Sequence, residues 1–214
     1  YKRQVLVSEI SKAFIKGLQG DHPKYYKVLS APKHFVANNE EYRRHSGSSE
    51  VPMKILRDYY LPAFKSSIVD AGAQSIMTAY NALNGIPCTA NKFLLQDILR
   101  NEWQFPGWVV TDCGAIYDIY VNHKYVNDPA EAVALSLKAG TDLNCGSSFR
   151  LHLKDAFDQG MVTIKDIDQA LLRIFTTRIK LGVFDPPSMN PYSKISKEVV
   201  DSKHHRELAH QIAL

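Results

Sequence analysis

The chain has 214 residues, enough for one domain of ordinary size or slightly more. Hydrophobic residues make up 45% of it and charged residues 22%, which is typical of a globular protein. The net charge is +4, and the basic residues are scattered in small groups, which argues against a nucleic-acid-binding surface. No apolar run approaches the roughly 20 residues that a membrane span needs.

Four short apolar runs with strand character alternate with stretches of helical pattern. We expect strands at residues 28–31, 75–79, 108–111 and 140–143. We expect helices at residues 8–17, 62–72, 93–103, 129–140, 163–182 and 204–214. The alternation predicts an α/β protein with a parallel sheet, and its four βα units amount to about half of a (β/α)8 barrel.

Capping residues mark the ends of two of these helices. Asp128 and Pro129 predict a helix start with an N-cap and a proline in the first turn, and Gly140 predicts where that helix ends. Glu131 is a capping-box acid for the same helix, and Thr163 with Asp166 predicts the start of the next helix. The helical pattern is therefore supported by its boundaries as well as by its period.

Reactive or polar residues follow the predicted strands. Asp112 comes directly after the third strand, where a parallel barrel builds its active site, and a carboxylate there can serve as a nucleophile or a charge stabiliser. The alternative is that Asp112 caps the following turn. Lys33 and His34 follow the first strand, and Tyr80 follows the second, which favours a site. We expect Asp142, in the fourth, to serve a turn or an ion pair.

The three cysteines lack the spacing of a zinc site. Cys113 and Cys145 follow neighbouring predicted strands and can meet as a disulfide or as two unlinked buried thiols; the usual behaviour of free cysteine favours the second. The acids and histidines do not converge at ligand spacing, so we expect no metal and no cofactor. Five histidines are expected to be solvated: His123, His152, His204, His205 and His210.

Several motifs in order resemble glycoside hydrolase family 3. Residues 33–44 match K-H-F-x-x-N-N-x-E-x-x-R, and residues 77–81 read M-T-A-Y-N. Residues 109–112 read V-V-T-D, residues 139–143 A-G-T-D-L, and residues 181–185 L-G-V-F-D. The resemblance spans nearly the whole chain, which makes it more specific than any one motif.

The resemblance implies a retaining, exo-acting β-glycosidase that removes terminal β-D-xylosyl or β-D-glucosyl residues through a covalent glycosyl-aspartate. Its substrate would be an oligosaccharide or an aryl or alkyl β-glycoside. By position, Asp112 matches the nucleophile, and Lys33 and His34 match the pair that binds hydroxyls of the terminal sugar. Tyr80 matches the residue that contacts the nucleophile, and Met77 matches a residue lining the same subsite.

The acid/base catalyst is not assigned within the chain. Most of the family takes it from a glutamate in a second, downstream domain; the hexosaminidase branch has a K-H-F-P-G-H loop that this chain lacks. Glu40, Glu41 and Glu50 are expected to be surface or ion-pair residues. Arg44 and Glu41 match the charged pair of the signature, with a mainly structural role.

Domain organisation follows from the resemblance. Residues 1–185 would form the C-terminal half of a (β/α)8 barrel, and residues 186–214 the linker and start of a second α/β sandwich domain. Tyr1 is not a natural start and Leu214 falls within a helical pattern, so we interpret the chain as a fragment. Cys113 and Gly114, directly after Asp112, resemble the family's β-xylosidase and related β-glucosidase subgroup, and we favour a β-xylosidase over a β-glucosidase. The sequence does not define the cellular compartment; a periplasmic or a secreted location is compatible with it.

Two other classes of function remain as alternatives. A lysine at a barrel strand end is also typical of Schiff-base lyases, and Lys33 occupies such a place. A non-catalytic sugar-binding protein would fit the fragment alone. We expect the isolated fragment to aggregate or to be inactive, because half a barrel exposes a sheet edge and an apolar face.

Overall fold

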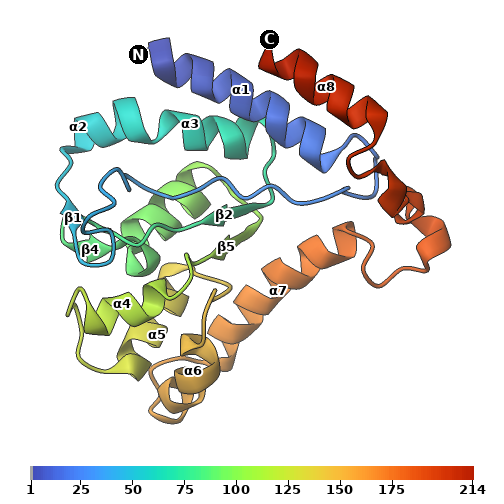
Figure 1. Cartoon of the computed structure of the whole chain (residues 1–214). Helices are drawn as coiled ribbons and strands as arrows, with labels where there is room; N and C mark the ends of the chain where they lie inside the picture. Colours follow the sequence, from blue (N-terminus) through green and yellow to red (C-terminus); the bar gives the residue numbers. More distant parts are fainter. Residues whose placement is uncertain (1) are drawn as a thin grey trace.

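The computed structural model describes residues 2–214, which form an α/β arrangement without a closed barrel among them (Figure 1). Two parallel strands lie at its centre, β2 (Ser75–Met77) and β5 (Trp108–Val110), in the register that pairs Ser75 with Trp108. Both strands lie where the sequence predicts them. Consecutive strands that lie side by side and parallel, with a helix between them, are the expected geometry of βα units.

The first predicted strand is wrong: residues 28–31 form no strand. The chain instead pairs with β2 four residues later, through a single bridge between Phe35 and Thr78. The Met77 N–H donates to the Pro32 carbonyl at 3.1 Å, and the Phe35 N–H donates to the Met77 carbonyl at 2.8 Å. Since Pro32 has no N–H, it can accept from β2 but cannot donate, which limits regular pairing.

The fourth predicted strand, residues 140–143, is reduced to one parallel bridge between Leu143 and Val110. The reason is local, because the carboxylate of Asp142 accepts the Val109 N–H at 2.8 Å. That donor would otherwise be available to a neighbouring strand. The central sheet therefore runs from Phe35 through β2 and β5 to Leu143, in sequence order.

Helices fill the connections between the strands. Before the sheet lies α1 (Lys2–Gln19), and the next connection contains α2 (Met53–Ile55), η1 (Leu56–Tyr60), α3 (Pro62–Lys65) and η2 (Ser66–Asp70). Pro62 separates η1 from α3 because its ring cannot continue the preceding helix. The following connections contain η4 (Phe93–Glu102), α5 (Pro129–Ala139) and α7 (Ile164–Lys180). The helices predicted at these places are confirmed, although η1, η2 and η4 are wound as π-helices.

The predicted caps are present. The Asp128 carboxylate accepts the Ala130 N–H at the start of α5, and Gly140 ends that helix with a φ of 114°. Thr163 and Asp166 form a capping box at the start of α7. Local sequence chemistry thus sets these boundaries.

Several short elements were not predicted. They are β1 (Ser48–Ser49), β3 (Ala82–Leu83), β4 (Ile86–Pro87), η3 (Cys88–Ala90), α4 (Ala115–Val121) and α6 (Ser148–Asp158). β3 and β4 form a hairpin whose turn places Asn84 and Gly85 at φ values of 49° and 83°. Both residue types tolerate that conformation. The remaining short strand, β1, pairs with β3 over two residues only, too few to leave a periodic signal in the sequence.

The buried core has two parts. The larger surrounds β2 and β5 and includes Phe35, Ile76 and Val109. The smaller lies among α4, α5 and α6 and includes Ile116 and Val133. Figure 1 shows α1 and α3 above the strands and α4 to α6 below them, so helices enclose the central strands from both directions.

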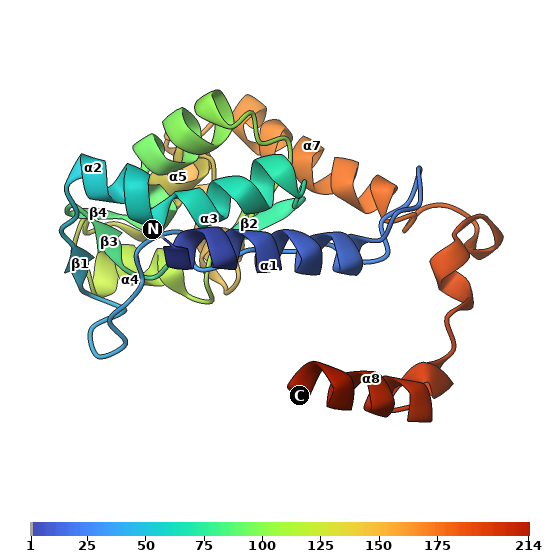
Figure 2. The same ribbon diagram turned by 90° about the horizontal axis from the view of Figure 1, so that it is seen from above.

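The C-terminal segment leaves this body. After α7 come η5 (Pro187–Met189), η6 (Pro191–Lys194), η7 (Lys197–Val199) and α8 (Lys203–Ala213). No residue of α8 is buried, and Figure 2 shows the helix separated from the rest. Within residues 2–214, none of the helices combines the length and apolarity that a bilayer span requires.

Candidate active site

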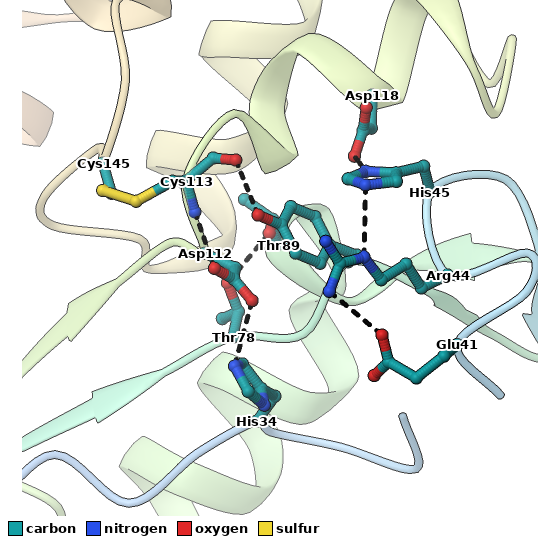
Figure 3. Close-up of polar contacts among 11 residues, drawn as sticks. His34, Glu41, Arg44, His45, Thr78, Thr89, Asp112, Cys113, Asp118 and Cys145 are labelled. Atoms are coloured by element: carbon teal, nitrogen blue, oxygen red, sulfur yellow. Dashed lines mark hydrogen bonds and ion pairs between the residues drawn. A yellow bond between two sulfur atoms is a disulfide. The ribbon is translucent and has the colours of Figure 1, made fainter. Parts of the chain in front are cut away.

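Asp112 lies two residues after β5, and each oxygen of its carboxylate has a nitrogen neighbour. Its side chain is 12% exposed. One carboxylate oxygen, Oδ1, accepts the Cys113 backbone N–H at 2.8 Å, and the other, Oδ2, lies 3.1 Å from His34 Nε2 (Figure 3). A carboxylate fixed at both oxygens has little freedom to turn. Asp112 therefore points in a defined direction at the end of a buried strand.

His34 reaches Asp112 because its segment runs beside β2 toward the same end of the sheet as β5. Burial lowers the pKa of His34 below its ordinary value of 6.5, while the charge of Asp112 opposes that shift and the charge of Lys33 adds to it. The imidazole is thus neutral at pH 7.

Tyr80 contacts the loop that carries Asp112. Its hydroxyl donates to the Cys113 carbonyl at 2.8 Å. Burial, followed by the negative charge of Asp112, raises the pKa of Tyr80, so the phenol stays protonated at neutral pH. The residue after Asp112 is therefore held on both sides, by its N–H to the carboxylate and by its carbonyl to Tyr80.

Two other predicted residues lie in this region without contacting Asp112 directly. Within the part of the chain that the structure describes, Lys33 is exposed and makes no hydrogen bond or ion pair with Asp112. Its influence is electrostatic, through His34. Met77 ends β2 and is half-buried, with its neighbour in register Val110. The structure thus brings together Asp112, His34 and Tyr80.

The two charged residues of the signature contact each other. Arg44 and Glu41 form an ion pair at 3.0 Å on the exposed loop that follows Phe35. The Arg44 guanidinium also lies over the Tyr80 ring, 5.1 Å from its centroid, which the sequence did not predict. Glu40 pairs with Arg43 at 3.1 Å, so both acids are ion-pair residues as expected.

The expectation of two unlinked thiols is wrong, because Cys113 and Cys145 form a disulfide with a Cα–Cα distance of 4.4 Å. The Thr111 hydroxyl accepts the Cys145 N–H at 3.0 Å and so brings the two strand ends together. Cys88 is the free cysteine, and burial raises the pKa of its thiol to about 12. Because Cys113 directly follows Asp112, the disulfide lies beside the candidate site (Figure 3).

Asp142 is an ion-pair residue, as predicted. Its buried carboxylate contacts Arg100 at 2.7 Å and Arg173 at 2.8 Å. Burial raises the pKa of Asp142, against the two guanidiniums, and lowers the pKa of Arg100 to about 10, which still leaves Arg100 charged at neutral pH. The group ties η4 and α7 to the sheet and lies outside the contacts of Asp112.

Sequence reasoning missed His45 and Asp118, whose side chains meet at 2.7 Å beside Tyr80. The prediction for His123 is also wrong, since its Nε2 lies 2.8 Å from the Tyr80 carbonyl oxygen. A signal for Asp118 existed: it lies between Ile116 and Ile119 in a short apolar helix, and an acid that such a helix buries needs a partner. The partner comes from a loop that no local pattern connects to α4.

Residues 2–214 contain no group of three or more acids, histidines or cysteines arranged to hold a metal ion. His204, His205 and His210 are exposed on α8, as expected. Around Asp112 the structure brings together a carboxylate, an imidazole and a phenol.

A carboxylate near the end of a parallel strand, with an imidazole and a phenol close by, can be compared with the sites of known families. The model of the glycosyl hydrolase family 3 N-terminal domain matches residues 2–177. The chain belongs to this family.

Among its relatives, a probable exo-1,4-beta-xylosidase of Neosartorya fischeri is 45% identical, over 97% of this chain and 28% of the relative. Another from Aspergillus clavatus is 43% identical over the same shares. The solved structure of an exo-beta-xylosidase with a xylobiose aziridine probe has a TM-score of 0.91 and 34% identity, covering 96% of this chain and 28% of that one.

A Listeria innocua beta-glucosidase solved with isofagomine has a TM-score of 0.84 and 30% identity, covering 95% of this chain and 29% of that one. The chain thus spans under a third of the length of the proteins it matches.

Proposed function

We propose that this chain carries the nucleophile of a retaining exo-β-glycosidase that removes terminal β-D-xylosyl or β-D-glucosyl residues. Its substrates would be oligosaccharides or aryl and alkyl β-glycosides. The observation that carries the proposal is the Asp112 carboxylate, buried at a strand end and held by the Cys113 N–H and by His34. Membership of the family and the relatives' xylosidase and glucosidase names support it.

The reaction has two steps. First, an Asp112 oxygen bonds to the anomeric carbon as the bond from that carbon to the leaving oxygen breaks, and a general acid gives the leaving oxygen its proton. Then water attacks the anomeric carbon, loses a proton to the conjugate base, and releases Asp112. We assign the acid to a glutamate of a second domain, as the family resemblance implies, and not to the local acids Glu40 and Glu41, which are exposed and paired with arginines.

The other candidate residues have distinct roles in this proposal. His34 and Lys33 would bind hydroxyls of the terminal sugar, and Met77 would line the same subsite. The neutral state of His34 suits it to exchange hydrogen bonds with both a hydroxyl and Asp112. Tyr80, protonated at neutral pH, would keep Asp112 in place by holding the Cys113 carbonyl.

We also propose the domain division at residue 185, with residues 1–185 as the C-terminal half of a (β/α)8 barrel. The remaining segment, 186–214, would link to a second α/β domain. The division is supported by the end of α7 at Lys180 and by the separation of α8 from the body (Figure 2). The parallel order from Phe35 to Leu143 is consistent with four consecutive barrel strands.

Xylose is proposed over glucose at the terminal position. The disulfide between Cys113 and Cys145 stands beside Asp112, where it would narrow the space for the hydroxymethyl group that glucose carries and xylose lacks. The Aspergillus and Neosartorya relatives named as xylosidases support the same choice. A β-glucosidase is the second candidate, supported by the likeness to the Listeria enzyme.

The test is hydrolysis of aryl β-xyloside and β-glucoside by the full-length protein that contains this chain, with the first-formed sugar anomer observed by NMR. The β anomer should form first, and faster from the xyloside. Asp112→Asn should lose at least about a thousandfold in kcat, whereas Asp168→Asn, on the exposed face of α7, should not. If the α anomer formed first, the retaining mechanism would be overturned. If neither substrate were hydrolysed, the glycosidase assignment would be overturned.

A further inference from the structure

A continuous series of polar contacts passes beside the Tyr80 ring and has no role in the reaction described above. Arg44 is paired with Glu41 at 3.0 Å and donates its Nε–H to His45 Nε2 at 3.3 Å. His45 Nδ1 lies 2.7 Å from the Asp118 carboxylate (Figure 3). The imidazole is 4.4 Å from the Tyr80 ring, measured between centroids.

The contacts define how His45 is protonated. An arginine Nε–H can only donate, so the lone pair of His45 Nε2 must face Arg44. The proton of the neutral ring is then on Nδ1, from which it is donated to Asp118. A single neutral tautomer satisfies both neighbours, so the ring has one preferred orientation against Tyr80.

Burial of Asp118 makes this contact strong. Asp118 is only 3% exposed, and a buried carboxylate without partners is costly. Its described side-chain partners are His45 and the amide of Asn122. The loop around His45 is otherwise open to solvent, as Tyr42 shows with 92% exposure. Asp118 thus anchors an exposed loop to α4 at the position of Tyr80.

We propose that His45 and Asp118 are positioning residues that hold Tyr80 in place, and that Tyr80 in turn fixes the nucleophile loop. The inference rests on the function proposed above. α4 holds Tyr80 at a second point, because His123, just after the helix, lies 2.8 Å from the Tyr80 carbonyl oxygen. The Tyr80 hydroxyl then holds the Cys113 carbonyl, and the Cys113 N–H holds Asp112.

The expected signature is a loss in kcat with little change in KM. Contacts to the sugar hydroxyls do not pass through His45, so ground-state binding should stay within about threefold of wild type. A misdirected nucleophile loses transition-state geometry, and displacements of the order of 1 Å cost up to about 100-fold. Loss of the His45 ring should therefore lower kcat by about 10- to 100-fold.

The informative variant is His45→Asn, because an asparagine amide N–H can replace Nδ1–H as the donor to buried Asp118 but has no ring to pack on Tyr80. Asp118→Asn is the conservative partner: its amide oxygen still accepts from His45, so kcat should stay within about threefold of wild type. His152→Asn is the matched control. That histidine also lies near an aspartate and a tyrosine, Asp155 at 3.9 Å and Tyr120 at 6.4 Å, away from the site.

The variants are made in the full-length protein that contains this chain, and kinetics are measured with an aryl β-xyloside. A second readout is independent of turnover: 3-fluorotyrosine is incorporated, and the ¹⁹F signal of Tyr80 is assigned with Tyr80→Phe. The signal should shift in His45→Asn and stay in place in Asp118→Asn and His152→Asn. Melting temperatures identify any variant that has lost its fold.

The outcomes separate the two proposals. A wild-type protein that hydrolyses the xyloside, with a His45→Asn variant of unchanged kcat or an unmoved Tyr80 signal, overturns the positioning role. A wild-type protein without hydrolysis overturns the proposed function, and the ¹⁹F signal then decides by itself whether His45 holds Tyr80. Reduced kcat together with a shifted signal supports both.

Discussion

At the scale of single residues, the site depends on which groups are charged. Asp112 accepts the Cys113 N–H at one oxygen and lies 3.1 Å from His34 Nε2 at the other, and His34 is kept neutral by burial. Tyr80 is kept protonated, first by burial and then by the charge of Asp112. A carboxylate with two neutral polar side chains near it is suited to attack at a carbon that becomes cationic.

The lowered pKa of His34 predicts a pH dependence of stability. Between the unfolded value near 6.5 and the lower folded value, the unfolded chain binds a proton that the folded chain does not. The free energy of unfolding should therefore fall as the pH drops through this window, and His34→Gln should reduce the slope. Urea unfolding at pH 7.5 and pH 5.5 measures it. An unchanged slope in His34→Gln, or an equal change in the control His204→Gln on exposed α8, would contradict the assignment.

At the scale of elements, strand ends and helix caps were predictable, whereas contacts between loops were not. The positions of Asp112 and Tyr80 beyond strand ends were predictable because each follows an apolar run that is a true strand, and the Asp128 cap was predictable because capping is local. Residues 28–31 were mistaken for a strand, since apolar character alone does not show where pairing occurs. His45 was missed because its partner, Asp118, is 73 residues away.

The buried ion group of Asp142 stabilises the junction of β5, η4 and α7. Asp142→Asn would leave the largely buried Arg100 and the partly buried Arg173 without their carboxylate, and we expect the free energy of unfolding to fall by about 3–5 kcal/mol. Asp58→Asn breaks an exposed pair with Lys54 and should lower the free energy of unfolding much less. Urea unfolding of both variants makes the comparison. Equal effects would show that burial adds nothing to the Asp142 group.

The disulfide joins the start of the α4 segment to the loop before α6. Its partners are 32 residues apart, so the loop-closure entropy of the unfolded chain predicts about 3–4 kcal/mol of stabilisation. The double variant Cys113→Ala, Cys145→Ala should lose that amount in urea unfolding. Thiol titration of the unfolded, unreduced chain should find one thiol, Cys88, and three after reduction. Three thiols before reduction would contradict the pairing.

At the scale of the whole molecule, the helix before the central strands and the last helix packed on them both carry exposed apolar side chains. On α1, Leu6, Ile10 and Phe14 are exposed, and on α7, Leu172 and Ile179 are. Exposed apolar faces of this kind favour association with other protein surfaces. The sequence predicted this exposure from the strand count, since four parallel strands cannot close a barrel. It did not predict the separation of α8, which depends on the path of residues 186–202.

The 214-residue chain alone is therefore expected to self-associate and to lack glycosidase activity. Sedimentation velocity should show species larger than a monomer, and the substitutions Phe14→Lys and Leu172→Lys together should raise the monomer fraction. Tyr42→Lys, at an isolated exposed tyrosine, should have no such effect. A monomeric chain that cleaves an aryl glycoside at the rate of the full-length protein would contradict both expectations.

The central claim is that Asp112 forms a covalent bond with the sugar, and trapping tests it most directly. The full-length protein containing this chain is incubated with a 2-deoxy-2-fluoro β-xyloside or β-glucoside carrying a good leaving group, digested, and mapped by mass spectrometry. We predict a fluorosugar on Asp112, formed faster from the xyloside. Intact protein that turns over substrate but carries no adduct on Asp112 would contradict the claim.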